Sequence, residues 1–422
     1  MTLLRYIKKF TIRRLAHLLV SGRQNYMSDV LAMLLLFILD LTHKQNPLKT
    51  LPRRKELINF LEDLAEKVLQ DDSSQDYQGG LTKIHQPIQR NDRQLVFLDC
   101  HIEDSLTSNI IRNLFESARM HSGITSIYLN LARVPVNKRL EVLQSSLRDS
   151  ATQYYIIFEI HVGIGESKKT LHPNMFSEIN NSLNIKVVPI SFDLYRPFDE
   201  AFVTLWSPRC AAIIHLDPAS ARKFEVNTRM IFWPFVFTSQ KAIVSQEIEP
   251  NQNSLRNTIL FQGSINSQSR VRHLLLLSTW SKRLKLDIRI FQSNMQNLEN
   301  SIEQQAHYYQ DLSNALAVIN FNEKRKSTHS VITFRALETL SLGGCLLEQE
   351  SPQHSSQLSN LAVPYQHYLP FESPKDLTIL CWSLSRKPEI AEQIKTNAKK
   401  HWEHYYSEVK LWSELMDSLE SL

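Results

Sequence analysis

Short apolar runs alternate with longer amphipathic stretches from about residue 91 to residue 350, and this alternation restricts the fold more than any other feature of the sequence. The runs QLVFLDC (94–100), YYIIFEI (154–160) and ALAVINF (315–321) are examples. Continuous apolar runs of this length are typical of strands buried on both faces, and the helix-length stretches between them indicate parallel strands joined by helices. The pattern predicts an α/β protein with mostly parallel sheets.

The alternation is interrupted by the polar stretch SQEIEPNQNSLRN at 245–257, which is the best candidate for a linker. Because 422 residues are too many for one ordinary core, we predict two doubly wound, Rossmann-like domains. The expected domains are residues 91–245 and residues 256–385. Residues 1–90 should form a helical extension and linker, and residues 386–422 should form helices that pack back across the domain interface.

The charge and the cysteines favour a cytoplasmic protein that does not bind nucleic acid. The net charge of +5 is small for this length, and the four cysteines lie too far apart to suggest disulfides or a metal site. The longest apolar run, at 30–39, is too short to span a membrane. Residues 1–23 contain six basic residues and no acid. They could bind the inner face of a membrane or pack on the protein itself with a solvated basic face.

The segment TFRALETLSLGGCLLEQESPQ (333–353) contains two adjacent glycines in a chain that has nine. Gly343 would cap the preceding helix, and Gly344 would let a ligand approach the backbone. Ligands of open α/β sheets lie beyond the carboxyl ends of strands, near helix N-termini, and this segment follows such a strand end. Arg335 and Glu338 share one face of the helix, and on spacing alone a surface ion pair is the better explanation for them.

The same segment resembles a known family of enzymes. INFNEKRKSTHS followed by FRALETLSLGGCLL is similar to the donor site of GT-B glycosyltransferases, in particular the spore-maturation CgeB-like and group 1 types. FQGSINSQSRVRHLLLL (261–277) and VVPISFDLYRP (187–197) resemble two further strands of that group. The resemblance covers about residues 91–420. It implies a hexosyltransferase-like enzyme whose two domains face a cleft, with a nucleotide-sugar donor held mainly by the second domain and the acceptor mainly by the first.

The resemblance also implies roles for individual residues. Glu338 would accept hydrogen bonds from the ribose of the donor, and Arg335 would orient that carboxylate or bind the diphosphate. Lys324 and Lys326 are alternatives for the diphosphate, but a solvated loop explains them better. Ser330 stands where many retaining members have a second acid, which puts the retaining mechanism in doubt. The full set of donor-binding residues implied by the family is Gly263, Ser264, Arg270, Arg272, Arg335, Glu338, Gly343 and Gly344.

The candidates for the chemistry are His161, Asp193 and Glu338. His161 follows a buried strand and would act as a base or hydrogen-bond partner, although a histidine with only a structural role is equally plausible. Asp193 would bind or deprotonate the acceptor, and His101 and Asp104 are weaker candidates for that role. Because no Asp-x-Asp element follows a strand, we predict a reaction that needs no metal and no cofactor besides the nucleotide-sugar.

Two alternatives remain open at this stage. The chain could be an inactive GT-B-like binding or scaffold protein, which the serine at position 330 favours slightly. It could also act mainly at a membrane surface through its basic N-terminal helix. The acceptor, whether a glycan, a protein or a lipid, cannot be read from the residues.

Overall fold

The structure is a computed structural model, and it describes most of the chain from residue 52 onward. The described residues are 52–69, 92–100, 106–147, 149–160, 176, 183–191, 203–222, 224, 228–236, 255–263, 265, 267–291, 301–322, 331–350 and 357–422. The chain divides into two compact units. The five-stranded unit comprises Met1–Asp76, Ala242–Gln296 and Ala306–Trp402, and the six-stranded unit comprises Tyr77–Lys241, Asn297–Gln305 and Glu403–Leu422.

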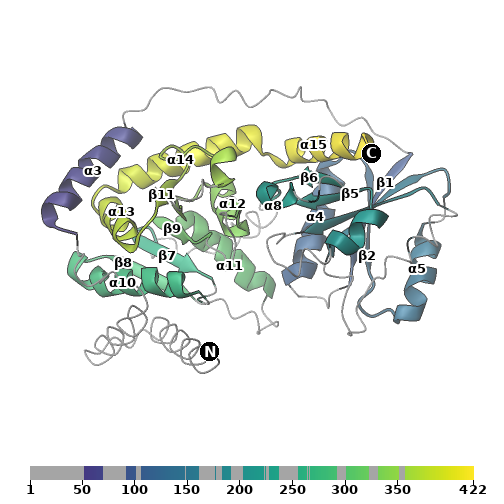
Figure 1. Cartoon of the computed structure of the whole chain (residues 1–422), viewed down its shortest axis with the longest axis horizontal. Coiled ribbons are helices and arrows are strands. Elements are labelled where there is room, and N and C mark those ends of the chain that lie inside the picture. Colours follow the sequence, from purple (N-terminus) through teal and green to yellow (C-terminus); the bar gives the residue numbers. More distant parts are fainter. Residues whose placement is uncertain are drawn as a thin grey trace. The chain divides into compact units, whose positions relative to one another are not determined.

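The six-stranded unit contains a wholly parallel sheet with strand order β2-β1-β3-β4-β5-β6. The helices α4 and α5 follow β1 and β2 in the chain (Figure 1). The bounds are β1 (Arg93–Asp99), α4 (Leu106–His121), β2 (Thr125–Asn130), η2 (Val136–Lys138), α5 (Arg139–Ser146), β3 (Gln153–Glu159), β4 (Ile185–Ser191), η4 (Ser207–Arg209), β5 (Ala212–His215), α8 (Pro218–Ala221) and β6 (Arg229–Phe232).

The five-stranded unit repeats the same winding in a second parallel sheet, with order β11-β10-β9-β7-β8. The bounds are α3 (Arg54–Leu69), β7 (Thr258–Gln262), α10 (Gln268–Leu284), β8 (Asp287–Phe291), α11 (Ser301–Asn314), β9 (Ala317–Asn320), α12 (Phe334–Ser341), β10 (Leu346–Gln349), η6 (Gln357–Asn360), β11 (Leu369–Phe371), α13 (Pro374–Arg386) and α14 (Pro388–Tyr405). In both sheets the order reverses beside the first strand, between β1 and β3 and between β7 and β9. Open α/β sheets bind ligands at such a switch point.

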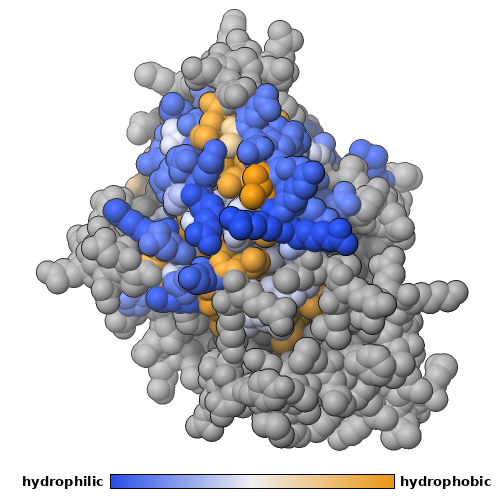
Figure 2. Space-filling model, turned by 90° about the vertical axis from the view of Figure 1, so that its left-hand side faces the viewer, coloured by the Kyte–Doolittle hydropathy of each residue, from blue (hydrophilic) through white to orange (hydrophobic). Residues whose placement is uncertain are grey.

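The core of the five-stranded unit lies mainly on one face of its sheet. Ile259, Ile319 and Leu347 point to this face and pack with residues of α10 and α13. Helix α3 joins the same core through Leu64 and Val68, and it contacts α13. The side of the molecule that carries α3 is largely hydrophilic, with a narrow band of hydrophobic residues (Figure 2).

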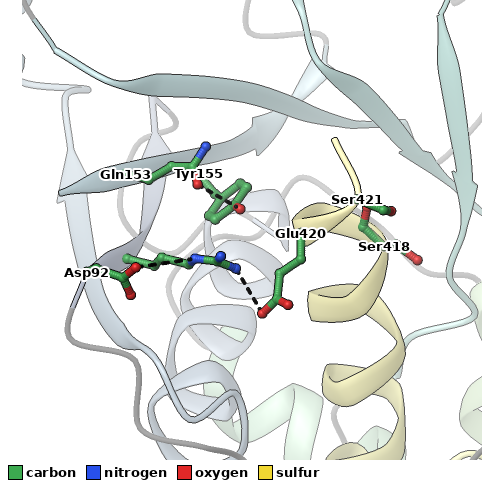
Figure 3. A network of polar contacts seen from close by, with 7 residues as sticks. Asp92, Gln153, Tyr155, Ser418, Glu420 and Ser421 are labelled. Carbon is green, nitrogen blue, oxygen red and sulfur yellow. Dashed lines mark hydrogen bonds and ion pairs between the residues drawn. The ribbon is translucent and has the colours of Figure 1, made fainter. Parts of the chain in front are cut away.

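The chain returns from the five-stranded to the six-stranded unit within α14, and α15 (Glu408–Glu420) packs on α4. The indole of Trp412 donates to Ser117 Oγ at 2.8 Å and meets the ring of Phe97 edge-on. At the end of α15, Arg93 Nη1 lies 2.9 Å from Glu420 Oε1 (Figure 3). The last helix therefore belongs to the core of the six-stranded unit, although it follows the other unit in the sequence.

The predicted fold class is confirmed, because two parallel-stranded, doubly wound α/β units are present. The thiols of Cys100, Cys345 and Cys381 are free and buried, as expected, and Cys210 is half-buried. Among the described residues, no helix is both long enough and apolar enough to cross a bilayer. Residues 1–51, including the basic segment 1–23, lie outside the described part of the chain.

Candidate functional site

The face of the five-stranded sheet that α11 and α12 cover changes from apolar to polar along its strands. Val318 pairs in register with Leu260 on one side and with Leu346 on the other, and this apolar row packs partly against α11. Two residues further along each strand, side chains of the same face are polar, because side-chain direction has a period of two. This polar row, at the carboxyl ends of the three strands, consists of Gln262, Asn320 and Glu348.

Arg335 brings a positive charge to the switch point between β7 and β9. It lies in the first turn of α12, which Thr333 caps by accepting a hydrogen bond from the Ala336 amide. Its Nη1 donates to Asn320 Oδ1 at 3.3 Å, and its guanidinium lies 5.4 Å from the ring centroid of Phe261. A Cβ added to Gly263 would lie 2.1 Å from its Nη2, so glycine is required there for the guanidinium to fit. Asn320, Phe261 and Gly263 are all neutral, so none of these three contacts is an ion pair.

A second arginine reaches the same strand end from another helix. Arg270 lies in the first turn of α10, where Ser267 caps the helix by accepting from the Arg270 amide at 3.2 Å. Its Nη2 donates to the carbonyl of Phe321, directly after β9, at 3.1 Å. Two guanidinium groups from α10 and α12 thus converge on the end of β9. Arginine forks at this place are suited to a phosphate or carboxylate ligand.

The polar row is buried but not fully satisfied. Within the described part of the chain, Gln262 Oε1 and Arg335 Nε are buried and have no hydrogen-bond partner. Buried polar atoms normally have partners, and the exceptions call for an explanation such as a ligand. One acceptor and one donor at the switch point are therefore available to a molecule bound there.

Glu348 lies at the centre of the polar row and is fully buried. Its carboxyl group accepts hydrogen bonds from Asn320 Nδ2 at 2.7 Å and from Asn322 Nδ2 at 2.9 Å. Burial raises the pKa of Glu348 to about 8, because desolvation outweighs the two amide hydrogen bonds and the nearby Arg335, which lower it. At neutral pH Glu348 is mostly an uncharged acid.

Glu338, the expected ribose acceptor, already has two partners. Tyr308 Oη donates to its Oε2 at 2.8 Å, and Tyr309 Oη donates to its Oε1 at 3.0 Å. Burial and the adjacent carboxylate of Glu338 raise the pKa of Tyr308 well above its usual value, so this hydroxyl remains a donor. A carboxylate has about four acceptor positions, and two of them are still open to a ligand. Tyr308 interacts with Arg335 as well as with Glu338, so this hydroxyl lies between the two charged side chains of α12.

Both adjacent glycines, Gly343 and Gly344, stand where an added Cβ would meet other protein atoms. At Gly343, with φ of +67°, an added Cβ would lie 3.0 Å from Cβ of Lys399. At Gly344 it would lie 2.7 Å from the Leu312 carbonyl, and the Gly344 amide donates to the Thr339 carbonyl at 2.7 Å. The space that a Cβ would need at Gly344 is thus occupied by protein atoms, and the role of Gly344 in donor binding stays a prediction. The glycine is required because α11 approaches the end of α12 closely.

The remaining predicted residues are only partly placed. Arg272 lies on α10, and its Nε is buried. His161, Asp193 and Ser264 lie outside the described residues, as do His101, Asp104, Lys324, Lys326 and Ser330. No cluster of His, Cys, Asp and Glu that could hold a metal ion occurs among the residues that the structure describes. The roles of these residues stay predictions.

Sequence reasoning missed Asn320, Glu348 and Tyr308 as members of the site. Asn320 and Glu348 interrupt otherwise apolar strands, and a polar residue inside such a strand was the signal that could have found them. Tyr308 carried no such signal, because its role depends on how α11 lies beside α12.

Comparison with solved structures identifies the fold. An alpha-glucosyltransferase in complex with UDP and a 13-mer DNA matches with a TM-score of 0.52 and 10% identity, over 78% of this chain and 99% of that chain. The same enzyme class in complex with UDP-glucose and DNA matches with a TM-score of 0.51 and 9% identity, over 78% and 99%. The chain has the GT-B fold. HepE of Anabaena, in complex with UDP and glucose, matches more weakly, with a TM-score of 0.47 and 11% identity over 78% and 100%.

These identities establish GT-B as the fold alone. A scan against protein-family models finds no matching model, and a search of the curated proteins finds no matching sequence. Membership of the CgeB-like group therefore stays a prediction.

Proposed function

We propose that this chain is a glycosyltransferase that takes a sugar from a nucleotide-sugar donor bound at the carboxyl edge of its five-stranded sheet. The observation that carries the proposal is the convergence of Arg335 and Arg270 on the end of β9. It lies at the switch point of a doubly wound sheet, which is where such sheets bind nucleotides. The neighbours of the same fold, which were solved with UDP or UDP-glucose, support this choice of ligand class.

The chemistry of transfer explains why cations are needed there. Cleavage of the bond between the sugar and the phosphate leaves negative charge on the leaving diphosphate. Fixed guanidinium groups stabilise such developing charge because they need not reorganise during the reaction. Arg335 and Arg270 are the proposed groups, and the proposed reaction needs no divalent metal. Glu338 is proposed to bind the ribose through its open acceptor positions.

A screen of nucleotide-sugars tests the proposal. UDP-, GDP-, ADP-, CMP- and dTDP-sugars are added to the whole protein, and the thermal unfolding midpoint is measured. The correct donor should stabilise the fold by about 2.7 kcal/mol at one hundred times its dissociation constant. Absence of stabilisation by every donor would contradict the proposal.

Glu338→Ala separates the role of Glu338 from that of the arginines. We expect the variant to lose most of the donor-induced stabilisation, while Glu392→Ala, an exposed acid on α14, keeps it. The unfolding midpoint of each variant with donor is compared with the midpoint of the same variant without donor. Any loss of stability that comes from the missing tyrosine contacts is then present in both measurements and cancels. Stabilisation equal to that of the wild type would remove Glu338 from the donor site and leave the arginines in place.

A second candidate is a GT-B-like protein that binds a nucleotide-sugar without transferring the sugar. The serine at position 330, where many retaining members of the resembled family have an acid, favours it. Donor-dependent release of free nucleoside diphosphate distinguishes the two candidates. Tight binding without any release, with water or a panel of sugar acceptors present, would support the second candidate.

A further inference from the structure

Glu348 ties the end of β9 to the end of β10. It is the register partner of Asn320 on the neighbouring strand, and its two oxygens accept from Asn320 and Asn322. These asparagines lie on either side of Phe321, whose carbonyl accepts from Arg270. A single carboxyl group therefore fixes the two side chains that flank the point where both guanidinium groups arrive.

Asn320 is the asparagine that, among the described residues, connects Glu348 to an arginine. Asn320 uses its Nδ2 toward Glu348 and its Oδ1 toward Arg335 Nη1, so the orientation of its amide is set from both sides. Asn322 donates a hydrogen bond from its Nδ2 to Glu348 Oε1. The chain of contacts thus runs from Glu348 through Asn320 to Arg335, and Arg335 in turn lies against Gly263.

We propose that Glu348 is a positioning residue of the donor site, which aims the guanidinium of Arg335 at the donor diphosphate through Asn320. This inference rests on the proposed function. The inference adds Glu348 to the proposed donor site as a residue that does not touch the donor.

The charge state of Glu348 gives this role a pH dependence. Two charged groups act on Glu348: Arg335 on α12 lowers its pKa, and Glu350 beyond β10 raises it. The other titratable groups of the site are Glu338 on α12, Tyr308 on α11 and Arg270 on α10. With a pKa of about 8, Glu348 keeps its proton at neutral pH. The uncharged acid does not compete with the donor diphosphate for the guanidinium of Arg335. As the pH rises through about 8 the proton is lost, and the new negative charge repels the diphosphate.

The first experiment measures the dissociation constant of UDP by calorimetry at about pH 7 and about pH 9 and at constant ionic strength. We expect wild-type affinity to fall about tenfold over this interval, beyond what the ionisation of UDP itself causes. Glu348→Gln cannot ionise and should lack this additional fall. Glu392→Gln is the control, because Glu392 is an exposed acid on α14 that pairs with Lys395, and it should keep the fall.

The second experiment compares the two asparagines and does not depend on the folding of the glutamate variant. Asn320→Ala should weaken UDP binding about tenfold at pH 7, because Arg335 Nη1 loses the acceptor Asn320 Oδ1, which orients the guanidinium. Asn322→Ala removes an equally buried amide of the same size and should weaken UDP binding by less than about threefold. Unfolding midpoints are recorded for both variants, since both lose a hydrogen bond to Glu348.

The outcomes separate this inference from the proposed function. Equal loss of affinity in the two asparagine variants, or an unchanged pH dependence in Glu348→Gln, overturns the positioning role while UDP binding by the wild type still supports the donor site. If the wild type binds neither UDP nor pyrophosphate, the donor site and the positioning role fall together.

Discussion

The two sheets of this protein have the same strand order but opposite charge at their switch points. In the five-stranded sheet, Arg335 and Arg270 reach the strand end beside β7 and β9. In the six-stranded sheet, β1 and β3 end in the acids Asp99 and Glu159, which are both buried. Each lies two residues beyond the register pair Phe97 and Ile157, so the two acids occupy neighbouring strands on one face.

The difference in charge means that two sheets of the same topology need not bind the same ligand. A diphosphate is attracted to guanidinium groups and repelled by carboxylates, so the charge at the switch point selects the sheet that binds it. Asp99 has instead a structural set of partners, because its Oδ2 accepts from Tyr128 Oη at 2.7 Å and from Asn130 Nδ2 at 3.4 Å. The topology of the sheet therefore determines where a ligand can bind, and the charge of the side chains determines which ligand is favoured there.

The largest effect should come from removing the positive charge of the five-stranded edge. We expect Arg335→Gln to weaken UDP binding and slow transfer by about one hundredfold, because a fixed charge-assisted contact to the diphosphate is lost. Binding is measured by calorimetry and transfer by release of UDP. Arg386→Gln is the control, since Arg386 lies at the end of α13 over the ring of Trp382. Comparable affinity in both variants would remove the contrast between the two edges.

A smaller effect is expected at Gly344, and it concerns stability. Gly344→Ala places a Cβ against the Leu312 carbonyl of α11 and should lower the free energy of unfolding by about 1–3 kcal/mol. The dissociation constant of UDP for the folded variant should not change. Chemical denaturation gives the stability, and calorimetry gives the affinity. A large loss of affinity with normal stability would support the expectation that Gly344 borders the nucleotide.

The smallest effect should come from the acidic edge of the six-stranded sheet. Asp99→Asn keeps the shape of the side chain but weakens the hydrogen bonds from Tyr128 and Asn130, and it should cost about 1 kcal/mol of stability. UDP affinity should stay within about twofold of the wild type, because the proposed diphosphate contacts come from Arg335 and Arg270 of the other sheet. A marked change in UDP affinity would show that the two edges do not act separately.

Much of the fold could be predicted because strands and helices leave local patterns. The runs at 94–100, 154–160 and 315–321 correspond to β1, β3 and β9 within a residue or two. The three-residue strand β11 was missed, since so short a run has no period of its own and is a strand only because it pairs with β10.

The site could be predicted less completely, and the reason is the distance between its parts in the sequence. Arg335, Arg270 and Glu338 were found because they occur in motifs that resemble those of glycosyltransferases. Glu348 and Tyr308 were not found, because neither belongs to a motif. Their partners lie about thirty residues away in the chain and become neighbours only when β10 pairs with β9 and α11 packs beside α12.

The sequence by itself determined the two parallel α/β units, because the buried positions of each strand and helix must be apolar. This requirement leaves a periodic pattern within each element that can be read locally. Only the tertiary structure decided that Gly344 serves helix packing, that Glu338 is held by two tyrosines and that Glu348 is an uncharged acid. These three facts depend on which groups approach from other elements. Desolvation, close contact and hydrogen bonding are properties of a place in the folded molecule, and the order of residues alone does not specify them.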